Sequence, residues 1–471
     1  MPIRQYAMDW RRGMKVGLLM AIVALCLFEF VLHRQSDVFQ EFQIELLSFR
    51  WMLLVCVAIW CGTFVFLTFS LNDLLLIGLL LIAIAAYFIT AYASSLPAMD
   101  AVTFLFGATL GKAACFALKA EKEVRSQKSE VRIFLIGLIG LLAFSSWWHL
   151  DMTGNFYHGP RWMGLWDNPN IYGMMMSVGL LLAIGLLAAS LKSKVQSPKS
   201  QQFLRIILFI AAGMMAVGLF FSYSRGAWLG TAIGLLYLAK TRWKFKRRSF
   251  LLPAICFLLL IFGIWFFWNT PRTAPWYFQR LDLSRGSVQH RVAAWKADFE
   301  IMRDHPFGVG WNKTVEIYEK NYSPPENGAA AITTNDYLML GTQLGIPALL
   351  YFVAYVALRL GVGRWKLGVG KNRPHLTLPR RFSLFFSRQP SSDLRPPSPA
   401  PARSREGTAR EDARPTATLD FGLWTLDTTQ VACHAAVVAM LVEFWFDGGL
   451  FELPTATVFW ILLELGRSDF T

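Results

Sequence analysis

The amino-acid sequence predicts an all-α polytopic membrane protein with about twelve transmembrane helices. Hydrophobic residues make up 55% of the 471 residues and charged residues only 16%, which is too little polar surface for a soluble protein of this size. Apolar runs long enough to cross a bilayer, roughly 20 residues each, recur along the chain. Basic residues gather in alternate short loops between these runs, which is the positive-inside pattern of membrane insertion.

The first apolar run follows a basic N-terminus and is too long for the core of a signal peptide, so we expect a retained anchor helix. Residues 204–239 could form one helix or two. A single helix would bury Arg225 near its centre at roughly 2.5–3.5 kcal/mol, so two helices with a turn at residues 222–226 are favoured. The predicted spans are residues 14–32, 50–70, 74–94, 98–118, 132–149, 171–190, 204–223, 226–239, 250–268, 336–360, 425–445 and 452–467.

Basic residues determine the expected orientation. Those between the spans fall on one side of the predicted topology, so we expect this side, and both termini, to be cytoplasmic. The net charge of +15 arises mostly from these loops, so a nucleic-acid partner is not expected. The residues are Arg4, Arg11, Arg12 and Lys15 at the N-terminus, Lys119, Lys122, Arg125, Lys128 and Arg132 after the fourth span, Lys192, Lys194 and Lys199 after the sixth, and Lys240, Arg242, Lys244, Lys246, Arg247 and Arg248 after the eighth.

The predicted topology divides the chain into three parts. Residues 1–360 form a membrane domain with a large extracytoplasmic loop at 269–334. Residues 361–422 are rich in Pro, Ser, Arg and Ala and have few apolar residues, so we expect a disordered cytoplasmic linker. Residues 423–471 contain the last two spans. All six cysteines lie within apolar runs without metal-ligand spacing, so we expect no metal site or disulfide framework from them.

Four polar clusters are expected at the extracytoplasmic face. They are the loop 151–170, with His158, Arg161, Asp167, Asn168 and Asn170; the turn SYSRGAWLG, with Ser222, Ser224 and Arg225; the loop 269–334, with Arg272, Arg280, Arg285, His290, Arg291 and His305; and the start of the tenth span, with Asn335, Asp336 and Tyr337.

Several guanidinium groups around one site suit an anionic, phosphate-bearing ligand, because arginine offers a planar fork of donors and stays charged. At a membrane face such a ligand would be a lipid phosphate or pyrophosphate. A single arginine at a helix end can instead reach lipid headgroups. Tryptophans near the clusters could stack on sugars or belong to the interfacial aromatic belt, and they are Trp162, Trp166, Trp228, Trp295 and Trp311.

The order and spacing of four motifs resemble the O-antigen ligase and polymerase family. These motifs are GLWDNPNIYGMMM, SYSRGAWLG, HRVAAWKADFEIMRDHPFGVGWN and TNDYLMLGTQLGIPALLYF, and the resemblance covers roughly residues 160–360. It implies a membrane glycosyltransferase fold of the GT-C type in a bacterial inner membrane. The implied activity is transfer or polymerisation of a glycan from undecaprenyl pyrophosphate, without metal, nucleotide or other cofactor, onto a lipid, glycan or protein acceptor.

The resemblance assigns roles to individual residues. Arg225 matches the arginine of the family's serine-arginine-glycine motif and Arg291 the loop arginine before a tryptophan, so both are expected to bind the pyrophosphate. The family usually has a histidine, as the presumed base, where this chain has Thr334, and a threonine hydroxyl cannot serve as a general base near neutral pH. The candidates to replace it are Asp336, His290 and His305, with Asp336 the first choice because it is nearest in sequence. The expected catalytic residues are therefore Arg225, Arg291 and Asp336, and the expected substrate-binding residues are Arg161, Asn170, Ser224, His290, His305, Asn335 and Tyr337.

Two other functions also fit these sequence features. A transporter or flippase for lipid-linked sugars would share the spans and arginines, but transporters place charged residues near the bilayer midplane. Candidates for such residues are few, namely Glu29, Asp100, Lys112 and Glu443. A non-catalytic subunit that binds lipid-linked glycans is the other alternative, to which the replacement of the histidine by Thr334 gives weight.

Overall fold

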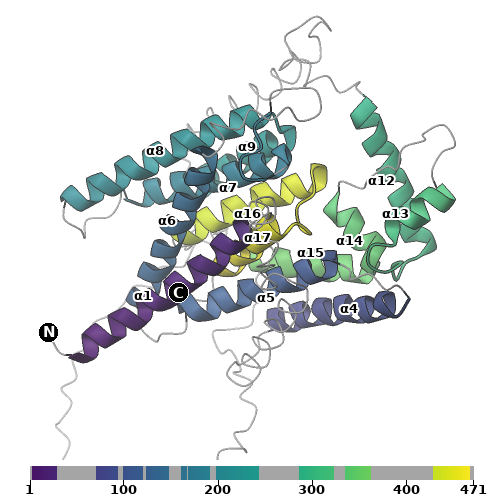
Figure 1. Cartoon of the computed structure of the whole chain (residues 1–471), viewed down its shortest axis with the longest axis horizontal. Helices are drawn as coiled ribbons and strands as arrows, with labels where there is room; N and C mark the ends of the chain where they lie inside the picture. The colour runs from purple at the N-terminus through teal and green to yellow at the C-terminus, as the bar shows by residue number, and fades with distance from the viewer. Residues whose placement is uncertain are drawn as a thin grey trace, which may run out of the picture. The chain divides into compact units, whose positions relative to one another are not determined.

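The computed structural model describes residues 3–28, 71–93, 99–119, 124–147, 161–166, 168–190, 198–242, 286–322, 335–361 and 428–466. None of these residues forms a β-strand, which confirms the predicted all-α class (Figure 1). The helices are α1 (Ile3–Leu27), α4 (Leu71–Ala93), α5 (Met99–Lys119), α6 (Val124–Trp147), α7 (Pro169–Ser190), α8 (Pro198–Ser222), α9 (Arg225–Arg242), α12 (Gly286–Asp304), α13 (Thr314–Ile317), the π-helix η4 (Tyr318–Tyr322), α14 (Asp336–Leu344), α15 (Ile346–Arg359), α16 (Thr428–Phe446) and α17 (Leu453–Leu465).

Four helices in the described part of the chain are long and apolar enough to cross a membrane. They contain Met99–Leu118, Pro169–Ser190, Gln202–Ser222 and Thr429–Phe446, and shorter apolar helices occupy Gly13–Leu27, Asp73–Ile89, Ile346–Arg359 and Leu453–Leu465. These helices suggest a membrane protein. The expected spans at 50–70 and 250–268 lie outside the described residues, so the number of about twelve spans and the GT-C resemblance stay predictions.

The chain divides into two units, Met1–Gly363 with Leu423–Thr471, and Arg364–Gly422. The second unit lies outside the described residues, and it contains most of the expected linker at 361–422. All the helices given above lie in the first unit.

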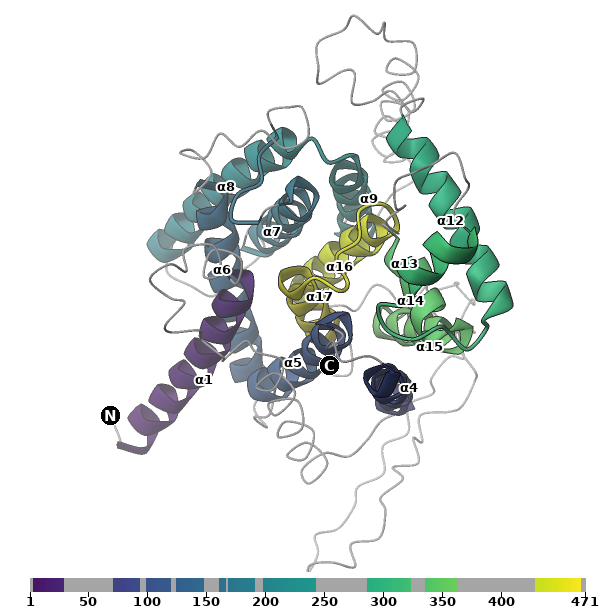
Figure 2. The ribbon, with the colours of Figure 1, turned by 45° about the vertical axis from the view of Figure 1, so that its right-hand side comes forward.

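Helices α7, α16 and α17 form the centre of the described core. Every residue of α17 is buried, as is most of α7, and a helix that is apolar on all sides is normally enclosed by others. Helix α7 packs against α8, α9 and α16, and α17 packs against α5 (Figure 2). By contrast, α8 exposes large apolar side chains on its outer face, including Phe203, Phe209, Ile210 and Phe220. Such a face suits contact with lipid.

The predicted break between the seventh and eighth spans is confirmed. Helix α8 ends at Ser222 and α9 begins at Arg225, so Arg225 lies at a helix start and not in the middle of a long apolar helix. Tyr223 has a positive φ of 49°, which reverses the chain direction here. The Ser224 hydroxyl accepts a hydrogen bond from Ala227 N at 3.2 Å and thereby caps α9.

The predicted tenth span, 336–360, is two helices instead of one. Gly345 separates α14 from α15 with a φ of 90°, and Pro347 follows in the first turn of α15, where its missing N–H costs no helical hydrogen bond. The loop after α12 binds this break, because Val309 N donates to Thr342 O and Ile346 N donates to Pro306 O, both at 2.9 Å. The sequence pattern showed the apolar run but not this tertiary contact.

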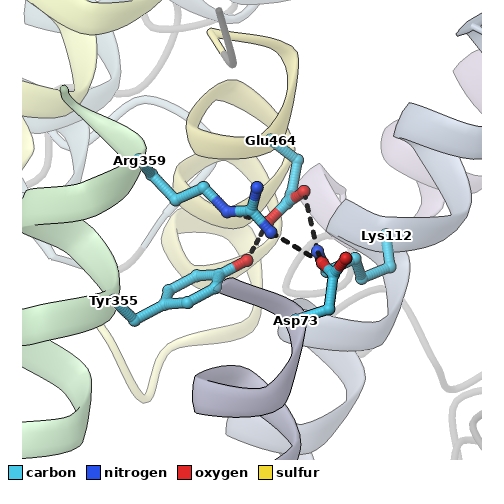
Figure 3. Close-up of polar contacts among 5 residues, drawn as sticks. All are labelled: Asp73, Lys112, Tyr355, Arg359 and Glu464. Atoms are coloured by element: carbon cyan, nitrogen blue, oxygen red, sulfur yellow. Dashed lines mark hydrogen bonds and ion pairs between the residues drawn. The ribbon is translucent and has the colours of Figure 1, made fainter. Parts of the chain in front are cut away.

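Five side chains from four helices form a buried charged network (Figure 3). Lys112 Nζ on α5 lies 2.5 Å from Asp73 Oδ1 on α4 and 3.1 Å from Glu464 Oε2 on α17. Arg359 on α15 approaches the same two carboxylates, at 2.8 Å from Asp73 Oδ1 and 3.3 Å from Glu464 Oε1. Tyr355 donates a hydrogen bond to Glu464. Two cations thus face two anions, and this balance allows the charges to be buried.

We expect Arg359→Ala to destabilise the fold. The substitution would leave Asp73 and Glu464 facing Lys112 alone, and removal of one partner from a buried ion pair costs about 3–5 kcal/mol. Denaturant unfolding of the detergent-solubilised protein measures the change in the free energy of unfolding. The matched control is Arg303→Ala, because Arg303 is 74% exposed and pairs with Asp304 at the surface. Equal losses in the two variants would contradict a stabilising role for the network.

Candidate functional site

The carboxylate of Asp447, just after α16, joins two of the polar clusters expected from the sequence. Ser224 Oγ, in the turn between α8 and α9, donates to Asp447 Oδ2 at 3.0 Å. Arg291, on α12, donates from Nη2 to Asp447 Oδ1 at 3.2 Å. The side chain of Asp447 is 6% exposed and that of Arg291 is 27% exposed. The guanidinium of Arg291 is thus anchored on one side and still partly open to a ligand.

The contacts around Asp447 form a junction between the α8–α9 turn, α12 and the end of α16. Arg225 lies within this junction, because Ser224 and Gly226, its two neighbours in the chain, both adjoin Asp447. Ser224 binds the carboxylate directly, and a Cβ atom on Gly226 would lie only 2.4 Å from Asp447 Oδ2. A larger residue at this position would therefore displace the carboxylate from its present place. The structure brings Arg291 and the Ser224–Gly226 turn to one carboxylate.

Three glycines on one face of α9 set this geometry. Gly226, Gly230 and Gly234 are four residues apart and therefore line one side of the helix. A Cβ on Gly230 would lie 2.7 Å from Ala439 O, and one on Gly234 would lie 3.0 Å from Ala435 O. Helix α9 thus rests directly on the backbone of α16, as small residues permit between membrane helices.

Arg161 and Asn170 connect the end of α8 to the start of α7 by hydrogen bonds. Arg161 is buried, donates from Nε to Ser222 O at 2.8 Å and from Nη2 to Asn170 Oδ1 at 2.6 Å. Asn168 Oδ1 accepts a hydrogen bond from Asn170 N at 2.9 Å at the start of α7. These contacts tie the start of α7 to the end of α8, and they engage two residues that the sequence assigned to substrate binding. Their geometry favours a positioning role.

The start of α14 carries three further predicted site residues, and each makes at least one hydrogen bond. Asn335 caps the helix, since its Oδ1 accepts from Tyr337 N at 3.0 Å and Leu338 N at 3.2 Å. Asp336 is 3% exposed, and its Oδ2 accepts from Leu450 N at 2.7 Å. Tyr337 donates to Leu441 O at 2.7 Å. Asp336 thereby holds the turn between α16 and α17, in which Asp447 lies.

Of the two expected histidines, the structure describes the side chain of His305 only. His305 follows the last residue of α12 and is exposed, and the 14 positions between it and Arg291 correspond to about 21 Å along a helix. The side chain of His290 and the whole of Thr334 lie outside the described residues, as do His158 and Asp167. The structure therefore separates His305 from the junction at Asp447.

Two acids to which the sequence motifs assign no role are notable in the structure, namely Asp447 and Asp298. Asp447 stands between the last two predicted spans and before Gly448 and Gly449, which have φ values of 73° and 130°; this polar turn was its only signal. Asp298 lies on α12, seven residues after Arg291, and is fully buried. Neither of its carboxyl oxygens has a hydrogen-bond partner among the described residues, and burial raises the pKa of Asp298 to about 8.

An open apolar groove of about 300 Å³ lies beside the turn, on the outer face of α8 and α9. It is lined by Ala216, Leu219, Phe220 and Trp228, the last of which is three residues after Arg225. Among the described residues, no group of three or more His, Cys, Asp or Glu side chains could hold a metal ion.

We expect Gly230→Ala to disturb the junction, because the added methyl group would collide with Ala439 O and force α9 away from α16. Such overpacking costs about 1–3 kcal/mol, which denaturant unfolding in detergent measures. The matched control is Gly213→Ala on α8, where no atom lies within 4 Å of the added Cβ. The control should be neutral or stabilising, because alanine favours a helix more than glycine does. A stable Gly230→Ala protein would contradict the close packing.

Comparison with known families identifies the segment that carries most of this geometry. Residues 210–353 match the family model described as O-Antigen ligase. The match runs from within α8 into α15 and includes Ser224, Arg225, Arg291 and the start of α14, whereas Arg161, Asn170 and Asp447 lie outside it. The chain matches no curated protein.

Proposed function

Because the matched segment supports assigning this chain to the O-antigen ligase/polymerase family, we propose that it transfers or polymerises a glycan from an undecaprenyl-pyrophosphate carrier at the extracytoplasmic face of the membrane. The observation that carries the proposal is the meeting of Arg291 and the Ser224–Gly226 turn at Asp447. We place the protein in the bacterial inner membrane, with both termini in the cytoplasm. The acceptor is a hydroxyl group of a lipid, a glycan or a protein.

Arg225 and Arg291 bind the pyrophosphate in this proposal. Cleavage at the anomeric carbon leaves negative charge on the pyrophosphate, and fixed cations in a water-poor site stabilise that charge most strongly. Asp447 holds Arg291 by one hydrogen bond, so the other guanidinium N–H groups can bind the departing oxygens. The reaction needs no nucleotide or metal in this mechanism, because the lipid carrier supplies an activated sugar.

The apolar groove beside Trp228 supports a lipid-linked donor. An isoprenoid chain along Leu219, Phe220 and Trp228 would bury apolar surface at the lipid-facing side of α8. Trp228 is one helical turn from Arg225, so a carrier bound there would bring its pyrophosphate close to this arginine.

The contacts of Asp336 favour a positioning role over that of a base. Its carboxylate accepts a backbone N–H from Leu450 and thereby shapes the turn that carries Asp447. A transporter has less support than an enzyme, because Lys112, one of the few charged residues within predicted spans, is held between Asp73 and Glu464. An ion-paired group of this kind stabilises the fold and is not open to a translocated ligand.

We expect Arg225→Ala and Arg291→Ala each to lower transfer by about 10²–10³-fold, the usual effect of removing one group that stabilises the charge of the transition state. The assay uses purified protein in proteoliposomes, an undecaprenyl-pyrophosphate glycan and a hydroxyl acceptor, and it measures release of undecaprenyl pyrophosphate. Arg303→Ala is the matched control, since this arginine lies on α12 but is exposed. Full activity of either test variant at wild-type protein level would refute the pyrophosphate-binding role.

The proposed orientation predicts opposite labelling of two single cysteines. Ser287→Cys lies at the start of α12 and should react with a membrane-impermeant maleimide added from the extracytoplasmic side. Ser392→Cys lies in the expected linker and should react only from the cytoplasmic side. Both are placed in a background without the six native cysteines. Labelling of both from one side would contradict the topology.

A further inference from the structure

The carboxyl group of Asp298 is buried without a hydrogen-bond partner in the described part of the chain. Buried polar groups are normally satisfied, and those that are not occur often at functional sites. Two other side-chain atoms, one on α12 and one at the start of α14, are also buried without a partner in the described part of the chain. They are Trp295 Nε1 and Asn335 Nδ2. One group accepts hydrogen bonds when ionised and the other two donate them, which is the set that a sugar hydroxyl requires.

The position of Asp298 on α12 directs it to the same side as Arg291. Arg291, Trp295, Asp298 and Met302 follow the spacing i, i+4, i+7 and i+11, so they share one face of the helix. Arg291 contacts Asp447, and the ring of Trp295 lies 5.9 Å from that of Trp445. This face of α12 therefore points to the end of α16.

The contacts of α12 with α14 place Asp298 level with the start of α14. The later parts of the two helices meet, because Met302 adjoins Gly341. Trp295 and Tyr337, earlier in each helix, both contact Trp445, so the helices run in the same direction. One turn back from the Met302–Gly341 contact, Asp298 is level with Tyr337. The ring of Tyr337 also lies 5.9 Å from Trp445, as does that of Trp295. Asp298 thus lies near the first turn of α14, on the side where Trp295 and Tyr337 both contact Trp445.

We propose that Asp298 is a catalytic residue that accepts the proton of the acceptor hydroxyl, a role that rests on the transfer function proposed above. The hydroxyl O–H bond breaks and its proton passes to the Asp298 carboxylate. The acceptor oxygen forms the new bond to the anomeric carbon. The bond from that carbon to the pyrophosphate oxygen breaks, and its electron pair leaves on the pyrophosphate held by Arg225 and Arg291. Trp295 Nε1 and Asn335 Nδ2 orient the acceptor by donating hydrogen bonds to its oxygens.

Burial raises the pKa of Asp298 to about 8, which makes its carboxylate a stronger base than an exposed aspartate and keeps its titration near the working pH. The titratable groups on the elements that pack against α12 are Asp336 and Tyr337 on α14, Tyr318, Glu319, Lys320 and Tyr322 on η4, and Asp447 after α16. Besides Asp298, α12 itself carries His290, Arg291, Lys296, Glu300, Arg303 and Asp304. Because only the ionised carboxylate of Asp298 can accept the proton, transfer by the wild type should rise with pH up to about 8.

A base of this kind also lowers the stability of the fold at high pH. The pKa of Asp298 is higher in the folded state than the unfolded value of about 3.9, so the folded protein binds more protons between these two values. Stability contributed by this group is therefore lost as pH rises from about 4 to 8. Asparagine at this position carries no charge and should remove the loss, whereas a structural aspartate would destabilise the fold when replaced.

The test compares Asp298→Asn with Asp304→Asn, an acid near the exposed end of the same helix. Transfer, binding of the undecaprenyl-pyrophosphate glycan and thermal unfolding are measured for each variant from pH 5.5 to 9 in proteoliposomes. We expect Asp298→Asn to lose transfer by about 10²–10⁴-fold at every pH, to bind the donor like the wild type, and to unfold at a higher temperature than the wild type at pH 8. Asp304→Asn should keep transfer.

Each other outcome identifies which idea fails. Transfer by Asp298→Asn equal to that of the wild type would overturn the inference and leave the proposed function in place. Loss of transfer together with loss of donor binding or a lower unfolding temperature at pH 8 would show a structural role and also overturn it. Absence of transfer by the wild type and by Asp304→Asn, despite donor binding, would overturn the proposed function and this inference with it.

Discussion

The carboxylate of Asp447 determines how the candidate site is assembled. A buried carboxylate is stable only where cations or hydrogen-bond donors reach it, and Asp447 is only 6% exposed. Its partners come from the turn at Ser224, 223 residues earlier, and from Arg291, 156 residues earlier. The contact with Ser224 requires α9 to lie directly on α16, which its glycine face permits. The packing of α9 on α16 and the geometry of the site at Asp447 therefore depend on each other.

Two polar centres within the described residues differ in physical character. At the first centre, Lys112 and Arg359 face two carboxylates, and the side chain of Arg359 is fully buried. Their ion pairs connect four helices. At Asp447, Arg291 is partly exposed and pairs with one carboxylate, while Arg225 lies in the adjoining turn. An enclosed, balanced network serves stability. A partly open site with a partly exposed guanidinium suits an anionic ligand.

Helix α12 connects the site to the rest of the molecule at both ends. Arg291 near its start contacts Asp447, and the glycine-containing loop after its end binds the break between α14 and α15. A helix held in this way can keep Asp298 buried even though its carboxyl group gains no hydrogen bond from the part of the chain that the structure describes. Retention of such a group costs stability, and sites that trade stability for activity are common in enzymes.

The sequence by itself determined the all-α class, the break before Arg225 and the two arginines that the structure brings to one junction. These features depend on local properties, namely the length of apolar runs, the cost of burying a charge in a helix centre and the order of short motifs. It did not determine the break at Gly345, the partners of Arg161, the distance of His305 from Arg291, the contacts of Asp447 or the burial of Asp298. Those depend on contacts between residues far apart in the chain, such as Ser224 with Asp447. Only the tertiary structure decides them, because a single sequence records which groups are polar but not which of them packing brings together.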